Sequence, residues 1–158
     1  MYEFRATKDW PYHVSSGGVV YKIENGIRKY ALLYRKPDPK KDNFESWHLP
    51  KGTLSSDETL EECGLREIKE ESGLDAVAEK YLGAIERAYV EPEAGWQVDR
   101  VVHYFLCKYR SGDSSQMDHE HDALEWCTAK EAIRKLWIHP KKENQIIERA
   151  EKHFSPNT

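Results

Sequence analysis

Three glutamates on one side of a predicted helix constrain this chain more than any other feature of its sequence. At about 100° of rotation per residue, Glu67, Glu70 and Glu71 fall within a single sector of the helix surface. The same side begins one to two turns earlier with Leu60, Cys63 and Gly64. Three anions that continue an apolar stripe would suffer repulsion and desolvation unless a hard cation neutralised them. Oxygen ligands at this spacing favour Mg²⁺, with Mn²⁺ as a substitute.

The limits of this helix follow from its flanking residues. The helical pattern runs from about Glu58 to Ser72. Gly73 stands where a glycine commonly ends a helix, and either Ser56 or Asp57 is expected to cap the start.

The remaining pattern predicts strands on both sides of this helix. Strands are expected at residues 13–23 and 29–34, joined by the turn signal ENGIR, and later at 77–90 with a break near Gly83, 98–109 and 124–128. Residues 35–46 read as an exposed loop and 111–116 as a turn. Two short helices, 129–136 and 142–153, are expected to close the chain.

Size and composition fit one ordinary domain over residues 1–158. The hydrophobic content of 39% allows a core without disulfides. No stretch approaches the roughly 18 apolar residues of a membrane span, and none has the form of a signal peptide, so we expect a cytoplasmic protein without a membrane partner. The three cysteines lack CxxC spacing and are expected to be buried free thiols.

The charge is unevenly distributed. Residues 57–71 carry seven acids and two bases, a net −5 within a chain whose total is −4. A metal bound there would reverse the sign of the charge that an anionic substrate meets. There is no basic stripe with interleaved aromatic residues, so no nucleic-acid partner is expected.

The residues around the glutamates form a specific motif. The segment from Gly52 to Leu74 reads G-x5-E-x7-R-E-U-x-E-E-x-G-U, where U is aliphatic, and so resembles the signature of the Nudix hydrolases at every specified position. The resemblance implies an α/β/α sandwich with a mixed sheet, in which residues 52–74 form a loop, a helix and a loop. It also implies hydrolysis of a phosphoanhydride.

The resemblance also assigns roles to residues of the motif. Glu67, Glu70 and Glu71 would hold the divalent metal, and Glu58 and Arg66 would hold the motif together by an ion pair. Gly52 would let the backbone turn tightly, so that the carbonyl of Lys51 faces the metal. The base that deprotonates water would be Glu67 or another of these glutamates, or a later one.

Two segments outside the signature resemble diadenosine tetraphosphate hydrolases within that family. One is the lead-in W-x-x-P-K-G, residues 47–52, and the other is the His-Glu-His sequence at 119–121 before a strand that ends in Trp126. The resemblance makes Glu120 a candidate for an extra metal ligand or the general base. The alternative for His119 and His121 is that they are ordinary polar residues of a loop.

Substrate contacts are suggested by residue type alone. His48 and Lys51 could pair with phosphate oxygens, although Lys51 could equally be a solvated loop cation. Tyr89 and Tyr104 are candidates for stacking on adenine, and packing within the sheet is the competing explanation. Trp96, in a loop with proline and glycine, could also cover a base.

We therefore expect a Mg²⁺-dependent hydrolase of a small nucleotide, as a monomer or weak dimer, with asymmetrical cleavage of diadenosine tetraphosphate to ATP and AMP as the first hypothesis. The alternatives within the family are ordinary or modified nucleoside triphosphates, capped RNA 5′ ends, and diphosphoinositol polyphosphates. The basic loop from Arg35 to Lys41 could serve such a highly anionic ligand, or could simply be solvated. A non-catalytic nucleotide-binding module is the alternative of another class.

Overall fold

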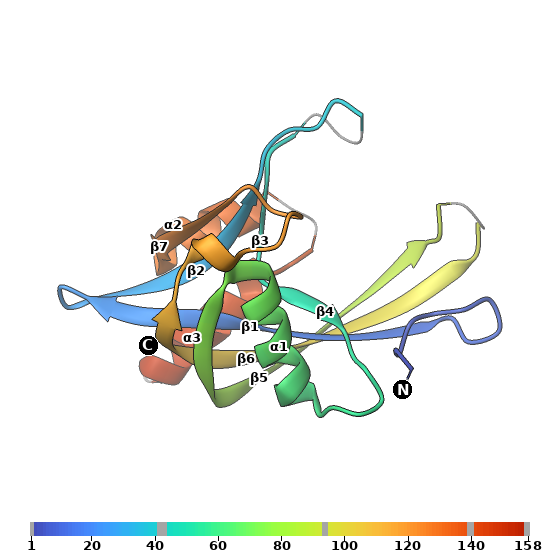
Figure 1. Ribbon diagram of the computed structural model, residues 1–158, viewed down its shortest axis with the longest axis horizontal. Coiled ribbons are helices and arrows are strands. Elements are labelled where there is room, and N and C mark those ends of the chain that lie inside the picture. Colours follow the sequence, from blue (N-terminus) through green and yellow to red (C-terminus); the bar gives the residue numbers. More distant parts are fainter. Residues whose placement is uncertain (1, 41–43, 93–94, 139–140, 157–158) are drawn as a thin grey trace.

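A mixed β-sheet forms the centre of the molecule (Figure 1). The computed structural model describes residues 2–40, 44–92, 95–138 and 141–156. Over these residues the sheet has seven strands in the order β3-β2-β1-β6-β5, with β4 paired to β1 and β7 paired to β2. The strands are β1 (Tyr12–Glu24), β2 (Ile27–Arg35), β3 (Ser46–His48), β4 (Lys51–Thr53), β5 (Leu74–Val90), β6 (Gln97–Gly112) and β7 (Ala123–Thr128).

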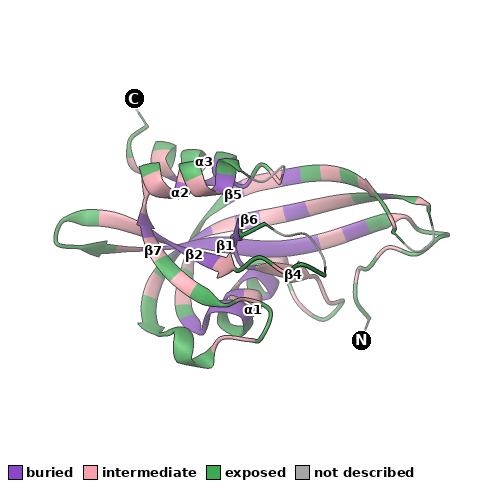
Figure 2. Cartoon of the chain, turned by 90° about the horizontal axis from the view of Figure 1, so that it is seen from above, coloured by how far each residue is buried: buried purple, intermediate pink, exposed green. Residues whose placement is uncertain are grey.

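Helices cover both faces of this sheet, as the pattern predicted (Figure 2). Helix α1 (Leu60–Ser72) lies on one face, and α2 (Ala129–Trp137) and α3 (Asn144–Phe154) lie on the other. A short 3₁₀ helix, Ser114–Gln116, follows β6. Because β1 and β6 run parallel while the other pairs are antiparallel, the α/β/α sandwich with a mixed sheet is confirmed.

Each face has its own hydrophobic core. On the side of α1 the core comprises Val20, Ala31, Ile68, Leu74 and Cys107. On the other side Val19, Leu32, Tyr104, Leu136 and Ile146 belong to a larger core. Adjacent residues of β1 thus enter opposite cores, as the two-residue period of a strand requires. All three cysteines are buried and free, as expected.

The predicted hairpin is present between β1 and β2. Asn25 and Gly26 both have positive φ, at 52° and 77°. Two consecutive positive values fit a type I′ turn, whose twist matches that of the two strands that it joins.

Helix α1 begins later than the sequence indicated. Its N-cap is Thr59 rather than Ser56 or Asp57, because Thr59 and Glu62 form a capping box in which each side chain bonds the backbone amide of the other. Such a cap contributes about 1 kcal/mol. The C-terminal prediction holds: Gly73 has φ 78° and its amide donates to the carbonyl of Lys69.

Several predicted strands and the start of α3 need correction. The two three-residue strands β3 and β4 were missed, since segments this short on either side of Pro50 show no alternating pattern. Strand β5 starts at Leu74 and is continuous past Gly83, where a register shift and a φ of 96° mark a bulge rather than a break. Strand β6 continues to Gly112, two residues into the expected turn. Helix α3 starts at Asn144 rather than Lys142.

The fold places the motif against the middle of the sheet. Strand β4 pairs with β1 at Ser15 to Gly17, and α1 packs over the same part of β1. A Cβ at Gly18 would lie 2.8 Å from the side chain of Ile68, so the absence of a side chain there lets α1 approach closely. In the described part of the chain, no helix is long and apolar enough to cross a membrane.

Candidate metal centre and active site

Glu71 is the most deeply buried of the three predicted metal ligands. Its side chain is 10% exposed, and its Oε1 accepts a hydrogen bond of 2.7 Å from the backbone amide of Lys51. Burial raises the pKa of this carboxyl to about 8, although the Lys51 contacts oppose the shift. The carboxylate is therefore oriented by β4 but is not neutralised by it.

Glu67 lies against the backbone of β4. A Cβ on Gly52 would approach the Glu67 carboxyl carbon to 2.1 Å, so a side chain at 52 would displace the Glu67 carboxyl from this position. This corrects the expected role of Gly52, which is not at a positive φ and makes no tight turn. Burial raises the pKa of Glu67, while an ion pair of 2.8 Å with Arg66 opposes the change.

Glu70 departs from the prediction that all three acids point inward. Its side chain is 55% exposed and lies 3.3 Å from Arg66, one turn earlier on the helix. The buried side of α1 is centred on Gly64, Ile68 and Glu71 instead, because Ile68 packs into the core below the sheet.

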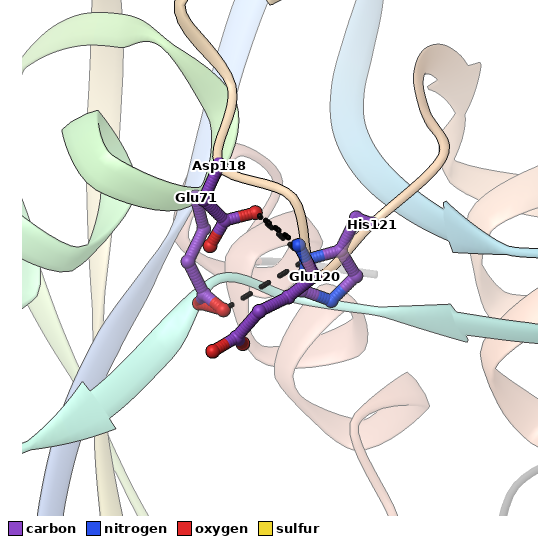
Figure 3. Close-up of side chains that lie close together, drawn as sticks. All are labelled: Glu71, Asp118, Glu120 and His121. Atoms are coloured by element: carbon purple, nitrogen blue, oxygen red, sulfur yellow. Dashed lines mark hydrogen bonds and ion pairs between the residues drawn. The ribbon is translucent and has the colours of Figure 1, made fainter.

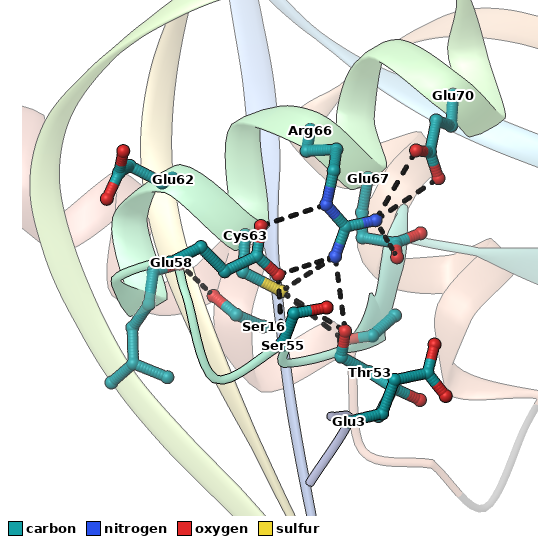
Figure 4. Close-up of polar contacts among 12 residues, drawn as sticks. Glu3, Ser16, Thr53, Ser55, Glu58, Glu62, Cys63, Arg66, Glu67 and Glu70 are labelled. Carbon is teal, nitrogen blue, oxygen red and sulfur yellow. Dashed lines mark hydrogen bonds and ion pairs between the residues drawn. The ribbon is translucent and has the colours of Figure 1, made fainter. Parts of the chain in front are cut away.

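Arg66 connects the two ends of the motif (Figure 4). Its guanidinium donates to Glu58 at 2.6 and 2.9 Å, which is the predicted ion pair in bidentate form. The same group reaches Glu67, Glu70 and the carbonyl of Thr53. The bidentate contact with Arg66 lowers the pKa of the Glu58 carboxyl to about 2. Arg66 thus holds the loop, the helix and β4 together beside the candidate metal ligands.

The loop before β7 brings a second set of ligands to Glu71 (Figure 3). One candidate ligand atom from each of Glu71, Asp118, Glu120 and His121 lies within 4.8 Å of the others. The amide of Asp118 donates to the carbonyl of Glu70, and Arg35 donates to the carbonyl of Glu120. These bonds hold the loop across the end of α1.

His121 is buried and faces two carboxylates. Within the described part of the chain its Nδ1 has no hydrogen-bond partner, yet it lies 3.7 Å from Asp118 Oδ1 and 3.9 Å from Glu71 Oε2. Burial lowers the pKa of this imidazole, which favours its neutral form. A buried nitrogen without a partner is costly, and a cation between it and the carboxylates would satisfy it. His119, by contrast, is exposed, as an ordinary loop residue would be.

Six carboxylates line one cavity of about 260 Å³, which we call the acid pocket: Glu3, Glu67, Glu70, Glu71, Asp118 and Glu120. The surplus of negative charge, the orphaned His121 nitrogen and the space left at Gly52 fit a divalent cation with oxygen ligands. Lys51 also lines this pocket, but the contact that it makes there is through its amide, so a carbonyl ligand stays a prediction.

The predicted substrate contacts have different outcomes. His48 is 5% exposed, bonds Ser46 at 2.7 Å, and has its pKa lowered to about 2 by burial, so it is neutral and unsuited to charge pairing with phosphate. Tyr104 is 1% exposed within the core and cannot stack on a base. Tyr89 and Trp96 are half-buried, and base stacking by either stays a prediction. Lys41 of the basic loop lies outside the described residues.

Sequence reasoning missed several residues that the fold brings to this site. Asp118 stood one residue before the His-Glu-His sequence, and its acidic side chain was the available signal. Arg100 and Lys141 belong to β6 and to the segment before α3, and line a cavity next to the acid pocket. Nothing in their local sequence distinguishes them from other surface cations.

A family model described as the NUDIX domain matches residues 11–150. The chain belongs to the Nudix family. One relative is a protein of Mycobacterium tuberculosis named mutator protein MutT4, 30% identical over 127 residues that cover 79% of this chain. This chain spans 50% of the length of that relative.

Other Nudix relatives carry names of nucleotide hydrolases. The asymmetrical bis(5′-nucleosyl)-tetraphosphatase of Caenorhabditis elegans is 26% identical over 121 residues, covering 76% of this chain and 82% of the relative. The CTP pyrophosphohydrolase of Escherichia coli is 26% identical over 103 residues, covering 65% and 70%. A solved binary complex of the C. elegans Ap4A hydrolase has the same fold, with a TM-score of 0.69, 22% identity, and coverage of 91% of this chain and 98% of that one.

Proposed function

We propose that this chain is a Mg²⁺-dependent hydrolase that cleaves a phosphoanhydride bond in a nucleoside polyphosphate. The observation that carries the proposal is the acid pocket, where glutamates of α1 and acids of the loop before β7 surround one cavity. In the reaction, a water oxygen forms a bond to phosphorus, the bridging P–O bond breaks, and the water gives up a proton.

Glu67, Glu70, Glu71 and Glu120, with Asp118 and His121 beside them, are the residues that would hold the metal. Bound Mg²⁺ would supply charge neutralisation of the phosphates and a lower pKa for water. Glu71 is oriented for this role by the Lys51 amide, and Glu67 by Arg66 and the space at Gly52.

Glu120 is our first candidate for the general base. Among the described residues, no hydrogen bond or ion pair occupies its carboxylate, whereas Glu67 is engaged by Arg66. A base needs a free oxygen within reach of the attacking water. Glu67 is the alternative, and substitution of each separates the two roles.

Asymmetrical cleavage of diadenosine tetraphosphate to ATP and AMP is the proposed reaction. The W-x-x-P-K-G lead-in, the His-Glu-His loop that supplies two members of the ligand cluster, and the tetraphosphatase relative of C. elegans support it. The CTP pyrophosphohydrolase and MutT4 relatives favour a second candidate, hydrolysis of a nucleoside triphosphate. Capped RNA and diphosphoinositol polyphosphates are weaker candidates. A binding module without catalysis is disfavoured because the motif is complete.

A substrate panel with Mg²⁺ tests these alternatives. The panel contains diadenosine tetraphosphate, the ordinary nucleoside triphosphates, an oxidised guanine triphosphate, a capped RNA and a diphosphoinositol polyphosphate, with products separated by chromatography. We expect ATP and AMP from the dinucleotide, at a kcat/KM at least about tenfold above any triphosphate. Higher efficiency on a triphosphate would replace the substrate assignment, and tight binding without turnover would support the non-catalytic module.

A further inference from the structure

A second cavity, of about 150 Å³, adjoins the acid pocket and has the opposite charge. Its basic residues come from separate parts of the chain: Arg35 from β2, Lys51 from β4, Arg100 from β6, and Lys141 from the segment before α3. We call this cavity the cation pocket. It shares Lys51, Glu71 and Glu120 with the acid pocket, so the two cavities lie next to each other.

Glu143 provides limited compensation for these cations. Its side chain is 2% exposed and lies 3.5 Å from the Lys51 ammonium. The other oxygen of Glu143 already accepts a hydrogen bond of 2.8 Å from the amide of Leu49. One carboxylate, shared between a backbone amide and Lys51, does not neutralise the four basic side chains of the cation pocket.

Arg100 is half-buried and forms no ion pair with any described residue. Its Nη2 donates to the hydroxyl of Ser15 at 3.1 Å, while its Nε is buried and has no hydrogen bond to any described residue. Burial, reinforced by Arg87, lowers the pKa of this guanidinium. A guanidinium remains charged in proteins, so an unpartnered Nε here represents a binding capacity for an anion.

Lys141 is a second cation of this pocket that forms no ion pair with any described residue. Its ammonium lies 3.2 Å from His48 Nδ1, a neutral group, and burial together with the nearby Lys51 lowers its pKa to about 8. His48 is itself held by Ser46, which fixes the imidazole beside Lys141. Buried cations crowded against one another are tolerated when an anion joins them.

We propose that the cation pocket is a phosphate subsite that binds the part of the substrate's polyphosphate chain beyond the phosphorus under attack. This inference rests on the proposed function, because it places the attacked phosphorus at the acid pocket. The cation pocket is smaller than the roughly 300 Å³ at which pockets for larger organic ligands begin, so its size suits a phosphate group better than a nucleoside. Arg100 offers fixed N–H donors and Lys141 a mobile ammonium, which together suit phosphate oxygens.

The subsite predicts that affinity grows with the length of the phosphate chain. A chain that reaches both pockets gains contacts to Arg100 and Lys141, whereas a single phosphate fills only one of them. Because these residues offer charged hydrogen-bond donors, loss of either should weaken binding by about tenfold or more.

The test is calorimetric titration with inorganic tripolyphosphate and with orthophosphate, in Mg²⁺, on the full chain. The variants are Arg100→Met and Lys141→Met, which keep much of the aliphatic length, and Lys141→Arg, which keeps the charge. Lys152→Met is the matched control, since Lys152 is an exposed cation in the last turn of α3, in neither pocket. Circular dichroism and thermal melting show whether each variant is folded.

We expect the wild type, Lys141→Arg and Lys152→Met to bind tripolyphosphate well above orthophosphate, and the two methionine variants to lose about tenfold or more. With substrate, those two should raise KM while leaving kcat within a few-fold. Unchanged binding in folded methionine variants, no tripolyphosphate binding by the wild type, or equal affinity for orthophosphate overturns the subsite. If the binding pattern holds but no nucleotide is hydrolysed, the proposed function fails and the subsite stands.

Discussion

The acid pocket and the cation pocket share a wall but are built in different ways. The α1 carboxylates of the acid pocket come from one helix within five residues, at positions 67, 70 and 71. The cation pocket collects side chains from β2, β4, β6 and the segment before α3. Each contains a buried side-chain nitrogen that has no hydrogen-bond partner among the described residues, His121 Nδ1 in one and Arg100 Nε in the other. A metal-bound polyphosphate would complete both, because it brings a cation to one and anions to the other.

Glu71→Gln is expected to have the largest effect, since it removes the buried anion on the wall that the two pockets share. Turnover should fall by about 10³-fold or more, the scale of losing a preorganised charged group at a reacting centre. The glutamine can still accept the Lys51 amide hydrogen bond, so the fold should persist. Steady-state kinetics with Mg²⁺ and a melting curve measure the two effects.

Glu61→Gln is the matched control for this variant. Glu61 lies in the first turn of α1, is exposed, and lines neither pocket. It should keep near-normal turnover. Comparable turnover in Glu71→Gln would show that Glu71 does not act in the reaction, and that the wall shared by the two pockets is not part of the active site.

The difference between the pockets also explains how much the sequence could predict. Glu67 and Glu71 were found because a helix converts spacing along the chain into proximity in space, at a known angle per residue. Arg100 and Lys141 were not, because their proximity depends on the pairing of β6 with β1 and on the path of the chain into α3. Tyr104 was misassigned for a related reason: alternation along β6 was visible, but not which face lay in the core.

Glu120→Gln should have the next largest effect and separates proton transfer from metal binding. A general base contributes about 10²–10⁴-fold, so kcat should fall by about 10²-fold. The substitution leaves the backbone contact from Arg35 to residue 120 intact. Stability should therefore change little.

Glu67→Gln is the comparison for this experiment. Measured side by side, the variant that retains Mg²⁺ binding while losing kcat identifies the base. If Glu120→Gln keeps full kcat and Glu67→Gln does not, the role of base passes to Glu67.

The stabilisation conferred by Mg²⁺ should depend on pH through Glu71. In the metal-free protein its pKa is raised from 4.5 to about 8, so the folded state retains a proton that the unfolded chain has lost. Stability without metal therefore falls as pH rises from about 4.5 to about 8. Mg²⁺ competes with that proton, so the rise in Tm with saturating Mg²⁺ should be larger at pH 8 than at pH 5.5.

Thermal melts with and without Mg²⁺ at several pH values measure this dependence. Glu71→Gln should abolish most of it, because the amide does not titrate. An equal Mg²⁺ effect at both pH values in the wild type would show that burial of this carboxyl does not govern metal binding.

The smallest effect is expected at Glu58, which pairs with Arg66 and does not line the acid pocket. Arg66 lowers the pKa of Glu58 from 4.5 to about 2, so the pair contributes stability above pH 4.5 that is lost as pH falls toward 2. Glu58→Gln should cost about 1–2 kcal/mol near neutral pH, since the pair is only partly buried, and should flatten the acid limb of the stability curve. Chemical denaturation from pH 7 to pH 2 measures both.

Tripolyphosphate affinity should not change, because Glu58 touches the acid pocket only through Arg66 and lies outside the cation pocket. A loss of that affinity would mean that the two pockets do not bind independently, and the distinction between them would fail.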